Sequence, residues 1–352
     1  MKNAKIMMIL GIFVLISIGA VYLLSNEREQ EGFTDDSPAS DEENAEEMTD
    51  DSPEDQEIVF DGMTDERLSA YHDNIRRGGP PVDGIPPIEN PEYQSLEAAD
   101  PSMENEDVVF IVEVEEGVFL YPQRILVWHE IVNETFGGEK MSITYCPLTG
   151  SAIGYKGNLQ GIETNYGTSG KLINSNLVMY DRETDSYIPQ ILGIAVEGEL
   201  KGQRLEEFPV LWSTWGRVKE HYDTANVLTE RTGFLRDYNR DPYGSYVEGG
   251  GYYFNNALVF PVMYENDRFE KKEVMIAGRV GDKPFAILKS TLAEEHSINF
   301  TLGERSLVAM YDEDLDTARV YMEEDGELIF VNSYDVMWFA WYAFFPETMV
   351  YE

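Results

Sequence analysis

Short apolar runs that end at turn residues recur along most of the chain, and they constrain its fold more than any other feature. Residues 107–121 read as two β-strands joined at Glu116-Gly117, and residues 141–146 alternate as a strand that Pro147 ends. Comparable runs lie at 177–180, 186–191, 194–197, 274–280, 284–288, 306–311 and 318–321. Because these runs show no regular β-α-β alternation, the sequence predicts an α+β fold that is rich in short strands.

Two stretches have helical rather than strand character. Residues 122–133 predict a short amphipathic helix with proline in its first turn, and residues 207–222 predict a second helix with Trp212 and Trp215 on one side. Trp338 and Trp341 have the same i, i+3 spacing. This spacing makes each tryptophan pair a helical neighbour pair, which predicts that both pairs belong to the core.

An internal repeat is also expected. Residues 109–146 match residues 274–311 in five residue types at a constant spacing of 165, and a W-x-x-W motif occurs in both parts of the chain. The sequence therefore predicts two degenerate halves, at about 61–235 and 236–352, of which the second is shorter. At this spacing Tyr311 stands where the first half has Cys146, so any chemistry is expected in the first half.

The N-terminus predicts a membrane anchor. Residues 6–24 are 19 residues without a charge, and about 20 such residues span a bilayer as a helix. Lys2 and Lys5 precede this run and acidic residues follow it, so the N-terminus is expected in the cytoplasm and the rest outside, in a single-pass topology. Residues 1–25 are therefore interpreted as an anchor, and a cleaved signal peptide is the alternative.

Residues 26–60 predict an acidic, disordered tether, because 15 acidic residues and one basic residue lie between positions 27 and 57. The extracytoplasmic domain would then span residues 61–352. The tether carries −14 and the two N-terminal lysines +2, which leaves −28 of the chain's net charge of −40 for the domain. Such a charge argues against a nucleic-acid partner and favours an exterior rich in salt, where self-repulsion is screened.

Cys146 is the single cysteine, so the chain can form neither an internal disulfide nor a multi-cysteine metal site. It ends a predicted strand before a proline turn, where Thr149 could donate a hydrogen bond to the thiolate. This arrangement would lower the pKa of the thiol and make it a nucleophile or a metal ligand. The alternative is a small buried apolar residue, the usual fate of a lone cysteine.

His129 and Glu130 lie 17 and 16 residues before Cys146 and are the nearest candidates to act with it. His129 would serve as a base or as a metal ligand beside the sulfur, which makes a metal ion the one cofactor that the sequence suggests. The alternatives are a surface or capping histidine, and a Glu130 that acts as a cap or pairs with Arg124.

Asp181 and Arg182 follow an apolar strand and form the candidate ligand-binding pair. The Arg182 guanidinium would hold an anionic ligand or neighbouring carboxylates. A structural ion pair is the alternative.

The chain contains several long and distinctive motifs: G-G-P-P-V-D-G-I-P-P-I at 78–88, W-H-E-I-V-N-E at 128–134, T-Y-C-P-L-T-G-S-A-I at 144–153, Y-G-T-S-G-K-L-I-N-S-N-L-V-M-Y-D-R-E-T at 166–184 and W-F-A-W-Y-A-F-F-P-E-T at 338–348. Together they resemble a known prokaryotic family, domain of unknown function 3179. The resemblance covers about residues 75–352. Many members of this family have C-P-L-C at the position of residues 146–149, and some carry selenocysteine at the second thiol position, which implies thiol or selenol redox chemistry.

This chain departs from the family pattern where the resemblance matters most. Thr149 replaces the second thiol, and a C-x-x-T sequence cannot form the local disulfide of a C-x-x-C pair. Tyr187-Ile188-Pro189 also stands where members usually have Leu-Trp-Ser. Both departures weaken the transfer of an activity from the family.

Two functions remain open after these observations. The first is a membrane-anchored extracytoplasmic protein with thiol-based redox or metal handling centred on Cys146. The second is a non-catalytic cell-surface module that binds a protein or a small molecule and whose site has degenerated. A hydrolase is the weakest option, because the sequence has no Ser-His-Asp signature.

Overall fold

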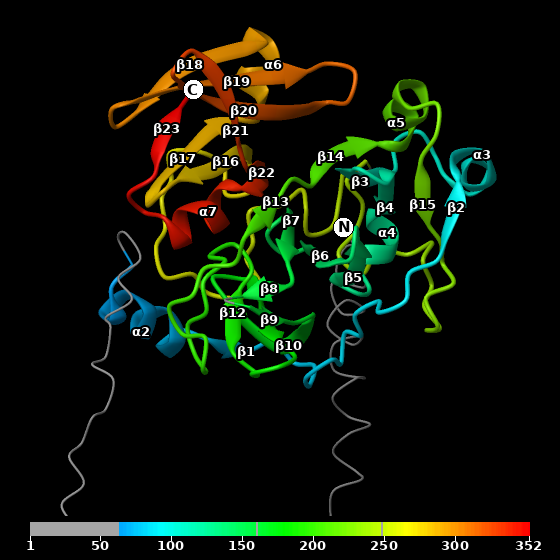
Figure 1. Cartoon of the computed structure of the whole chain (residues 1–352), viewed down its shortest axis with the longest axis horizontal. Helices are drawn as coiled ribbons and strands as arrows, with labels where there is room; N and C mark the ends of the chain where they lie inside the picture. Colours follow the sequence, from blue (N-terminus) through cyan, green and yellow to red (C-terminus); the bar gives the residue numbers. More distant parts are fainter. Residues whose placement is uncertain (1–62, 160, 248) are drawn as a thin grey trace, which may run out of the picture. The chain divides into compact units, whose positions relative to one another are not determined.

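The computed structural model describes residues 63–159, 161–247 and 249–352 (Figure 1). The predicted anchor at 1–25 and the predicted tether at 26–60 lie outside these residues. No helix in the described part is long and apolar enough to span a membrane. Strands dominate the described chain and helices are short, which confirms the prediction of a β-rich α+β fold.

The first part of the chain forms two sheets, and the first of them contains the hairpin that the sequence predicted at 107–121. All strand pairs in these sheets are antiparallel except the parallel pair of β4 and β15. One sheet has the order β14-β3-β4-β15-β2, and the other β13-β7-β6-β5. The strands of the first sheet are β2 (Tyr93–Ser95), β3 (Val108–Val114), β4 (Gly117–Pro122), β14 (Leu211–Thr214) and β15 (Asn226–Leu228). Those of the second are β5 (Ile131–Phe136), β6 (Glu139–Cys146), β7 (Ser151–Lys156) and β13 (Glu207–Phe208).

The second part of the chain builds the same two sheets again. Their orders are β22-β16-β17-β23 and β18-β19-β20-β21, and β23 pairs in parallel with β17 as β15 does with β4. The first sheet contains β16 (Val274–Val280), β17 (Lys283–Leu288), β22 (Ser333–Met337) and β23 (Met349–Tyr351). The second contains β18 (Ser297–Leu302), β19 (Arg305–Asp312), β20 (Thr317–Glu324) and β21 (Glu327–Val331).

The strand registers correct the spacing of the predicted repeat by one residue. Val109 pairs with Pro122 as Met275 pairs with Leu288, and Cys146 pairs with Ser151 as Asp312 pairs with Thr317. These pairs shift by 166 residues between β3 and β7, rather than by 165. Cys146 therefore corresponds to Asp312, and Tyr145 corresponds to Tyr311.

A long insertion distinguishes the first part from the second. Residues 157–206 join β7 to β13, whereas the equivalent connection between β20 and β21 consists of residues 325–326. The insertion contains β8 (Asn158–Leu159), β9 (Ile162–Glu163), β10 (Tyr166–Ile173), β11 (Asn176–Asp181) and β12 (Tyr187–Pro189), and β1 (Arg76–Arg77) pairs with β10.

Four groups of buried side chains hold these sheets together. One lies between the two sheets of the first part and includes Phe110 and Ile143, and another lies between the two sheets of the second part and includes Phe285 and Phe300. A larger group joins the insertion to the sheet of β16, β17 and β22. Burial of apolar surface on both sides of each hairpin sheet is the main stabilising force.

The helices differ most from the sequence predictions. The helix expected at 122–133 is reduced to α4 (Gln123–Leu126), because Ile131 and Val132 are β-branched and pair with β6. The helix expected at 207–222 is reduced to α5 (Trp215–His221), preceded by β13 and β14. Residues 194–197 form isolated bridges rather than a strand. The other helices are α2 (Asp65–Asp73), α3 (Leu96–Ala99), α6 (Lys289–Glu295) and α7 (Trp338–Phe344).

The tryptophan prediction is correct for one pair. Trp338 and Trp341 lie in α7 and are fully buried. Trp215 is also buried at the start of α5, but Trp212 lies on β14 and is partly exposed. Trp212 and Trp215 therefore do not share a helix face.

Candidate functional site

Cys146 is the last residue of β6, and its side chain is buried, with 1% of the residue exposed. The thiol donates toward the Ser175 carbonyl at 3.8 Å. Burial raises the pKa of this thiol to about 11, and the nearby Glu130 carboxyl adds to the rise. Hydrogen bonds from Thr149 and from the Leu177 backbone act in the opposite direction but are weaker. The predicted lowering of the thiol pKa is therefore wrong, because the effect of burial outweighs that of the hydrogen bonds from Thr149 and Leu177.

Thr149 belongs to a closed network of buried polar side chains beside the sulfur. Its hydroxyl lies 2.8 Å from Ser151 Oγ and accepts from Asn176 Nδ2 at 3.1 Å. Gln190 Oε1 accepts from both Ser151 and Asn176, at 2.8 Å each. These four side chains are buried and hydrogen-bonded to one another, so the network fixes the turn that follows Cys146.

Glu130 is the most unusual group near the sulfur. Its side chain is buried, and its carboxyl has no hydrogen-bond partner among the residues that the structure describes. Burial raises the pKa of this carboxyl to about 8, so it holds a proton at neutral pH. The alternative pairing with Arg124 is wrong, because Arg124 pairs with Glu230.

The backbone of Glu130 has a positive φ of 58°, and the equivalent residue of the second part, His296, has a φ of 60°. Tyr145 N–H donates to the Glu130 carbonyl at 2.7 Å, and Tyr311 N–H donates to the His296 carbonyl at 2.9 Å. The left-handed conformation is therefore a property of the helix-to-strand turn that both parts share. Of the two turns, only that of the first part has a buried carboxyl, because Glu130 is buried and His296 is exposed.

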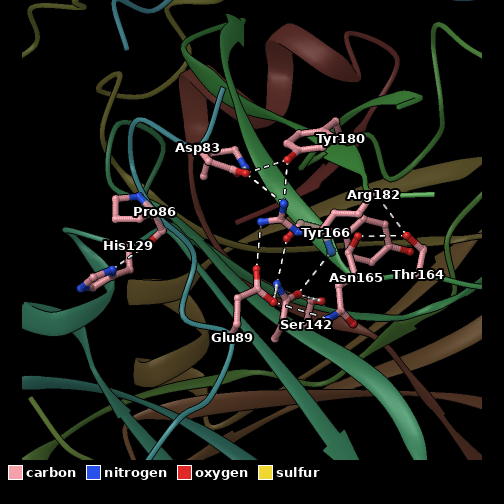
Figure 2. Close-up of polar contacts among 12 residues, drawn as sticks. Asp83, Pro86, Glu89, His129, Ser142, Thr164, Asn165, Tyr166, Tyr180 and Arg182 are labelled. Atoms are coloured by element: carbon pink, nitrogen blue, oxygen red, sulfur yellow. Dashed lines mark hydrogen bonds and ion pairs between the residues drawn. The ribbon is translucent and has the colours of Figure 1, made fainter. Parts of the chain in front are cut away.

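His129 makes no described hydrogen bond to Cys146. Its Nδ1 lies 2.7 Å from the Pro86 carbonyl and its Nε2 lies 2.7 Å from the Tyr238 hydroxyl; Figure 2 shows the first of these contacts. Burial lowers the pKa of His129 to about 4, which leaves the ring neutral. Because Pro86 can only accept, Nδ1 carries the proton and Nε2 accepts from Tyr238. Both ring nitrogens are therefore occupied.

The geometry gives no support to a metal ion held by His129 and Cys146. Within residues 63–352, apart from positions 160 and 248, no three His, Cys, Asp or Glu side chains come together as a possible metal site. The metal site therefore stays a prediction.

A long segment without described helices or strands, residues 229–273, covers Cys146 and Glu130. Tyr243 and Tyr252 lie near enough to the sulfur for its charge to contribute to their raised pKa values, and the Tyr252 hydroxyl donates to the Leu148 carbonyl at 2.7 Å. Asp241 accepts from Gln123 Nε2 at 2.9 Å and fastens the segment to α4. We call this segment the tyrosine loop.

Two further tyrosines of this loop extend the cover. Tyr246 and Tyr253 stack with ring centroids 3.8 Å apart, and the Tyr246 hydroxyl lies 3.0 Å from that of Tyr145. Sequence reasoning missed these residues as part of a site. The available signal was the density of five tyrosines between positions 238 and 253 in a stretch rich in glycine.

Arg182 and Asp181 lie elsewhere and serve the chain itself. The Arg182 guanidinium donates to Asp83 at 2.9 Å, to Glu89 at 2.8 Å and to the Tyr180 hydroxyl at 2.8 Å, as Figure 2 shows. The buried Asp181 carboxylate accepts from the backbone of the turn that follows and from the Thr184 hydroxyl at 2.7 Å. Of the two alternatives, this geometry matches a structural ion pair that holds neighbouring carboxylates.

Glu134 is a second buried carboxyl that the sequence analysis missed. Burial raises its pKa to about 8, and it accepts from the Tyr121 hydroxyl at 3.1 Å. The equivalent position in the second part is Phe300, a core residue. Glu134 is the last residue of the W-H-E-I-V-N-E motif, but nothing in that motif indicated that its carboxyl would be buried.

Comparison with known proteins identifies one family. A family model described as "Protein of unknown function (DUF3179)" matches residues 82–348. No curated protein and no solved structure matches the chain.

Proposed function

The chain belongs to the family described as "Protein of unknown function (DUF3179)", and we propose that it performs thiol exchange at Cys146, in a site that the tyrosine loop opens and closes. The observation that carries this proposal is the position of the buried Glu130 carboxyl, which lies near enough to Cys146 to raise the pKa of its thiol and has no hydrogen-bond partner in the described chain. A buried carboxyl near a thiol can give up a proton and, as a carboxylate, accept one from the thiol, which makes the sulfur a nucleophile.

The reaction that fits a single thiol is exchange with a disulfide of a partner. Glu130 first loses its proton to water, its carboxylate then takes the proton from Cys146, and the thiolate attacks one sulfur of the partner disulfide. A bond forms between the two sulfurs, the partner's own disulfide bond breaks, and the leaving thiolate takes the proton back from Glu130. Because Thr149 stands in place of a second thiol, an external thiol must release Cys146.

The tyrosine loop accounts for the inert state of the thiol in the closed structure. Burial is the largest cause of the raised pKa of Cys146, and the loop contributes Tyr243 and Tyr252 to that burial. Displacement of the loop would hydrate the sulfur while leaving the Thr149 and Leu177 donors in place. The thiol pKa would then fall toward or below its usual value.

A non-catalytic binding module remains the second candidate. The full occupation of both His129 nitrogens and the burial of Cys146 favour it, since neither group is free to react in the closed state. In that case the tyrosine loop would be a fixed cover.

Alkylation of Cys146 by iodoacetamide in the folded full chain separates the two candidates. The Tyr252→Phe variant removes the hydrogen bond to Leu148, which is worth about 0.5–1.5 kcal/mol, and should raise the alkylation rate about 2- to 10-fold. Tyr264→Phe is the matched control, because Tyr264 belongs to the same loop and is 46% exposed. Equal rates for all three proteins, with alkylation only in denaturant, would refute a loop-gated thiol.

We also propose, from the sequence, that residues 1–25 anchor the domain to the outer face of the cell membrane. The uncharged run and the two lysines before it support this location. A protease added to intact cells should then digest the domain while leaving the N-terminus protected. Protection of the whole chain until the cells are lysed would contradict the proposal.

A further inference from the structure

Arg204, near the end of the insertion at 157–206, is a partly exposed arginine that forms no ion pair with any carboxylate of the described chain. Its Nη1 donates to the Gly281 carbonyl at 3.5 Å, at the outer limit for a hydrogen bond. Arg67, which is also partly exposed, instead pairs with Glu347. Because a guanidinium has several N–H donors, most of those of Arg204 have no acceptor among the residues that the structure describes.

A second arginine already uses the carboxylate nearest to Arg204. Arg279 of β16 pairs with Glu207 of β13, donates to the Leu192 carbonyl at 2.7 Å and has a side chain that is 6% exposed. Burial and the charge of Arg279 lower the pKa of Arg204 to about 10, which still leaves its guanidinium charged at neutral pH. Two guanidinium groups therefore face one carboxylate, and one positive charge is left unmatched in a partly buried place.

This unmatched positive charge is unusual for the chain. The domain carries −28, so carboxylates are abundant on its surface, yet none of those described pairs with Arg204. A partly dehydrated charge without a partner is unfavourable, and a bound anion would offset it.

Asn332, which lies just before β22, has an orphaned acceptor at the same ion pair. Its Nδ2 donates to Glu207 Oε2 at 2.9 Å, whereas its Oδ1 is buried and has no hydrogen-bond partner in the described chain. A carboxylate can only accept, which fixes the end of the amide that faces Glu207. The Oδ1 atom therefore lacks a donor, and a ligand that brings one would satisfy it.

These two needs define the chemistry of a ligand. Arg204 calls for a negative charge with acceptor oxygens, and Asn332 Oδ1 calls for a hydrogen-bond donor. Chloride and sulfate supply the charge without the donor. Hydrogen phosphate and hydrogen carbonate supply both, because each is an anion that keeps a hydroxyl group.

We propose that Arg204 and Asn332, beside the ion pair of Arg279 with Glu207, bind a small oxyanion that carries its own hydroxyl group, such as hydrogen phosphate or hydrogen carbonate. The oxygens of the anion accept from the Arg204 guanidinium, and its hydroxyl donates to Asn332 Oδ1. Arg204 and Asn332 are both partly exposed, so the anion reaches them from solvent. The site does not depend on the chemistry proposed for Cys146.

A bound anion would also join two parts of the fold. Arg204 belongs to the insertion at 157–206, whereas Asn332 and Arg279 belong to the second part of the chain. An anion between Arg204 and Asn332 should therefore stabilise the folded chain, because it binds the folded form and not the unfolded one.

Isothermal titration calorimetry of the full chain in a mild detergent tests the proposal. The probes are potassium phosphate, hydrogen carbonate and sulfate, at one slightly alkaline pH and at a constant ionic strength set with KCl. Hydrogen phosphate or hydrogen carbonate should bind saturably and at least about 10-fold more tightly than sulfate, which cannot donate to Asn332. The tighter of the two hydroxyl-bearing anions identifies the preferred ligand.

Two variants assign the binding to these side chains. Arg204→Gln should weaken it by at least about 10-fold, and Asn332→Leu should remove the preference over sulfate. Arg305→Gln is the matched control, because Arg305 also forms no ion pair in the described chain but is exposed, and it should bind as wild type does. Thermal unfolding without added anion should show Arg204→Gln to be at least as stable as wild type, since the variant removes a charge without a partner.

Three results would each overturn the proposal. The first is a wild-type chain that binds neither hydroxyl-bearing anion saturably. The second is sulfate that binds as tightly as hydrogen phosphate, since Asn332 Oδ1 would then take no part. The third is binding that keeps its wild-type affinity in Arg204→Gln, which would place the anion elsewhere.

Discussion

At the scale of single residues, burial decides the chemistry of the candidate site more than residue type does. Cys146 and Glu130 are both kept protonated by desolvation, whereas His129 is kept neutral by it. The sequence identified these three residues from their proximity along the chain. It could not indicate their protonation states, because these depend on the tyrosine loop, which lies about 100 residues further along.

Glu130 should make folding stability depend on pH. Its pKa is about 8 in the folded chain and about 4.5 without burial, so its contribution to stability is complete below pH 4.5 and lost as the pH rises through 8. His129 acts oppositely, but only below its unperturbed pKa of 6.5. Thermal unfolding between pH 6.5 and 8 should therefore show stability falling with pH, by up to about 1.4 kcal/mol per unit for this group.

The Glu130→Gln variant checks this assignment, because it removes the titration and keeps the shape of the side chain. Its melting temperature should fall less steeply than that of wild type between pH 6.5 and 8. Glu134 has a similar pKa and serves as a comparison through Glu134→Gln. An unchanged pH slope in Glu130→Gln would contradict a protonated Glu130.

Thr149 occupies a position that should accept a second thiol. Thr149 N–H lies 3.2 Å from the Cys146 carbonyl in a tight turn, which brings the two α-carbons within the range of a disulfide. The Thr149→Cys variant should therefore form an internal disulfide under mild oxidation, lose about 2 Da in mass and resist alkylation. Thr149→Ser is the control. Two free thiols after oxidation would show that the turn cannot close the bond.

At the scale of elements, the bounds of strands were predicted better than those of helices. The hairpin at 107–121 and the strand at 274–280 follow from alternation and turn residues, and the structure has both. The helix expected at 122–133 fails because its second part reads equally well as a strand, and pairing with β6 decides the outcome. A one-residue error in the repeat had the same origin: sequence identity is a weaker guide to register than backbone pairing.

Arg182 should stabilise the fold, because its ion pairs with Asp83 and Glu89 hold an irregular segment against the end of β11. The Arg182→Met variant keeps most of the apolar stem but leaves two partly exposed carboxylates without a partner. We expect a loss of about 1–2 kcal/mol in the free energy of unfolding, measured with urea. Arg268→Met, which breaks the more exposed pair with Glu352, should cost less. Equal losses in both variants would refute a special role for Arg182.

At the scale of the whole molecule, the sequence predicted two related parts and an acidic surface, and the strand orders of the first part recur in the second. The insertion at 157–206 was not predictable as a cover, because its strands read like any others. Its Gln190 forms hydrogen bonds with Thr144 and Tyr155, so the insertion covers one face of the sheet that contains the buried thiol.

The charge of −28 on the domain should make its stability depend on salt. Repulsion between surface carboxylates is screened within about 10 Å at 0.1 M and about 3 Å at 1 M ionic strength. The melting temperature should therefore rise when KCl is increased from ~0.1 M to ~2 M. Equal melting temperatures in both solutions would contradict the predicted adaptation to a salty exterior.

The parallel pairs that complete the two hairpin sheets also set an order for folding during synthesis. β4 can pair with β15 only after residues 226–228 have been synthesised and have left the ribosome. β17 can pair with β23 only after Met349–Tyr351 has been synthesised, more than 60 residues after the end of β17. Each sheet therefore has an unpaired edge during part of synthesis, and the strand that completes the second sheet is made after the strand that completes the first.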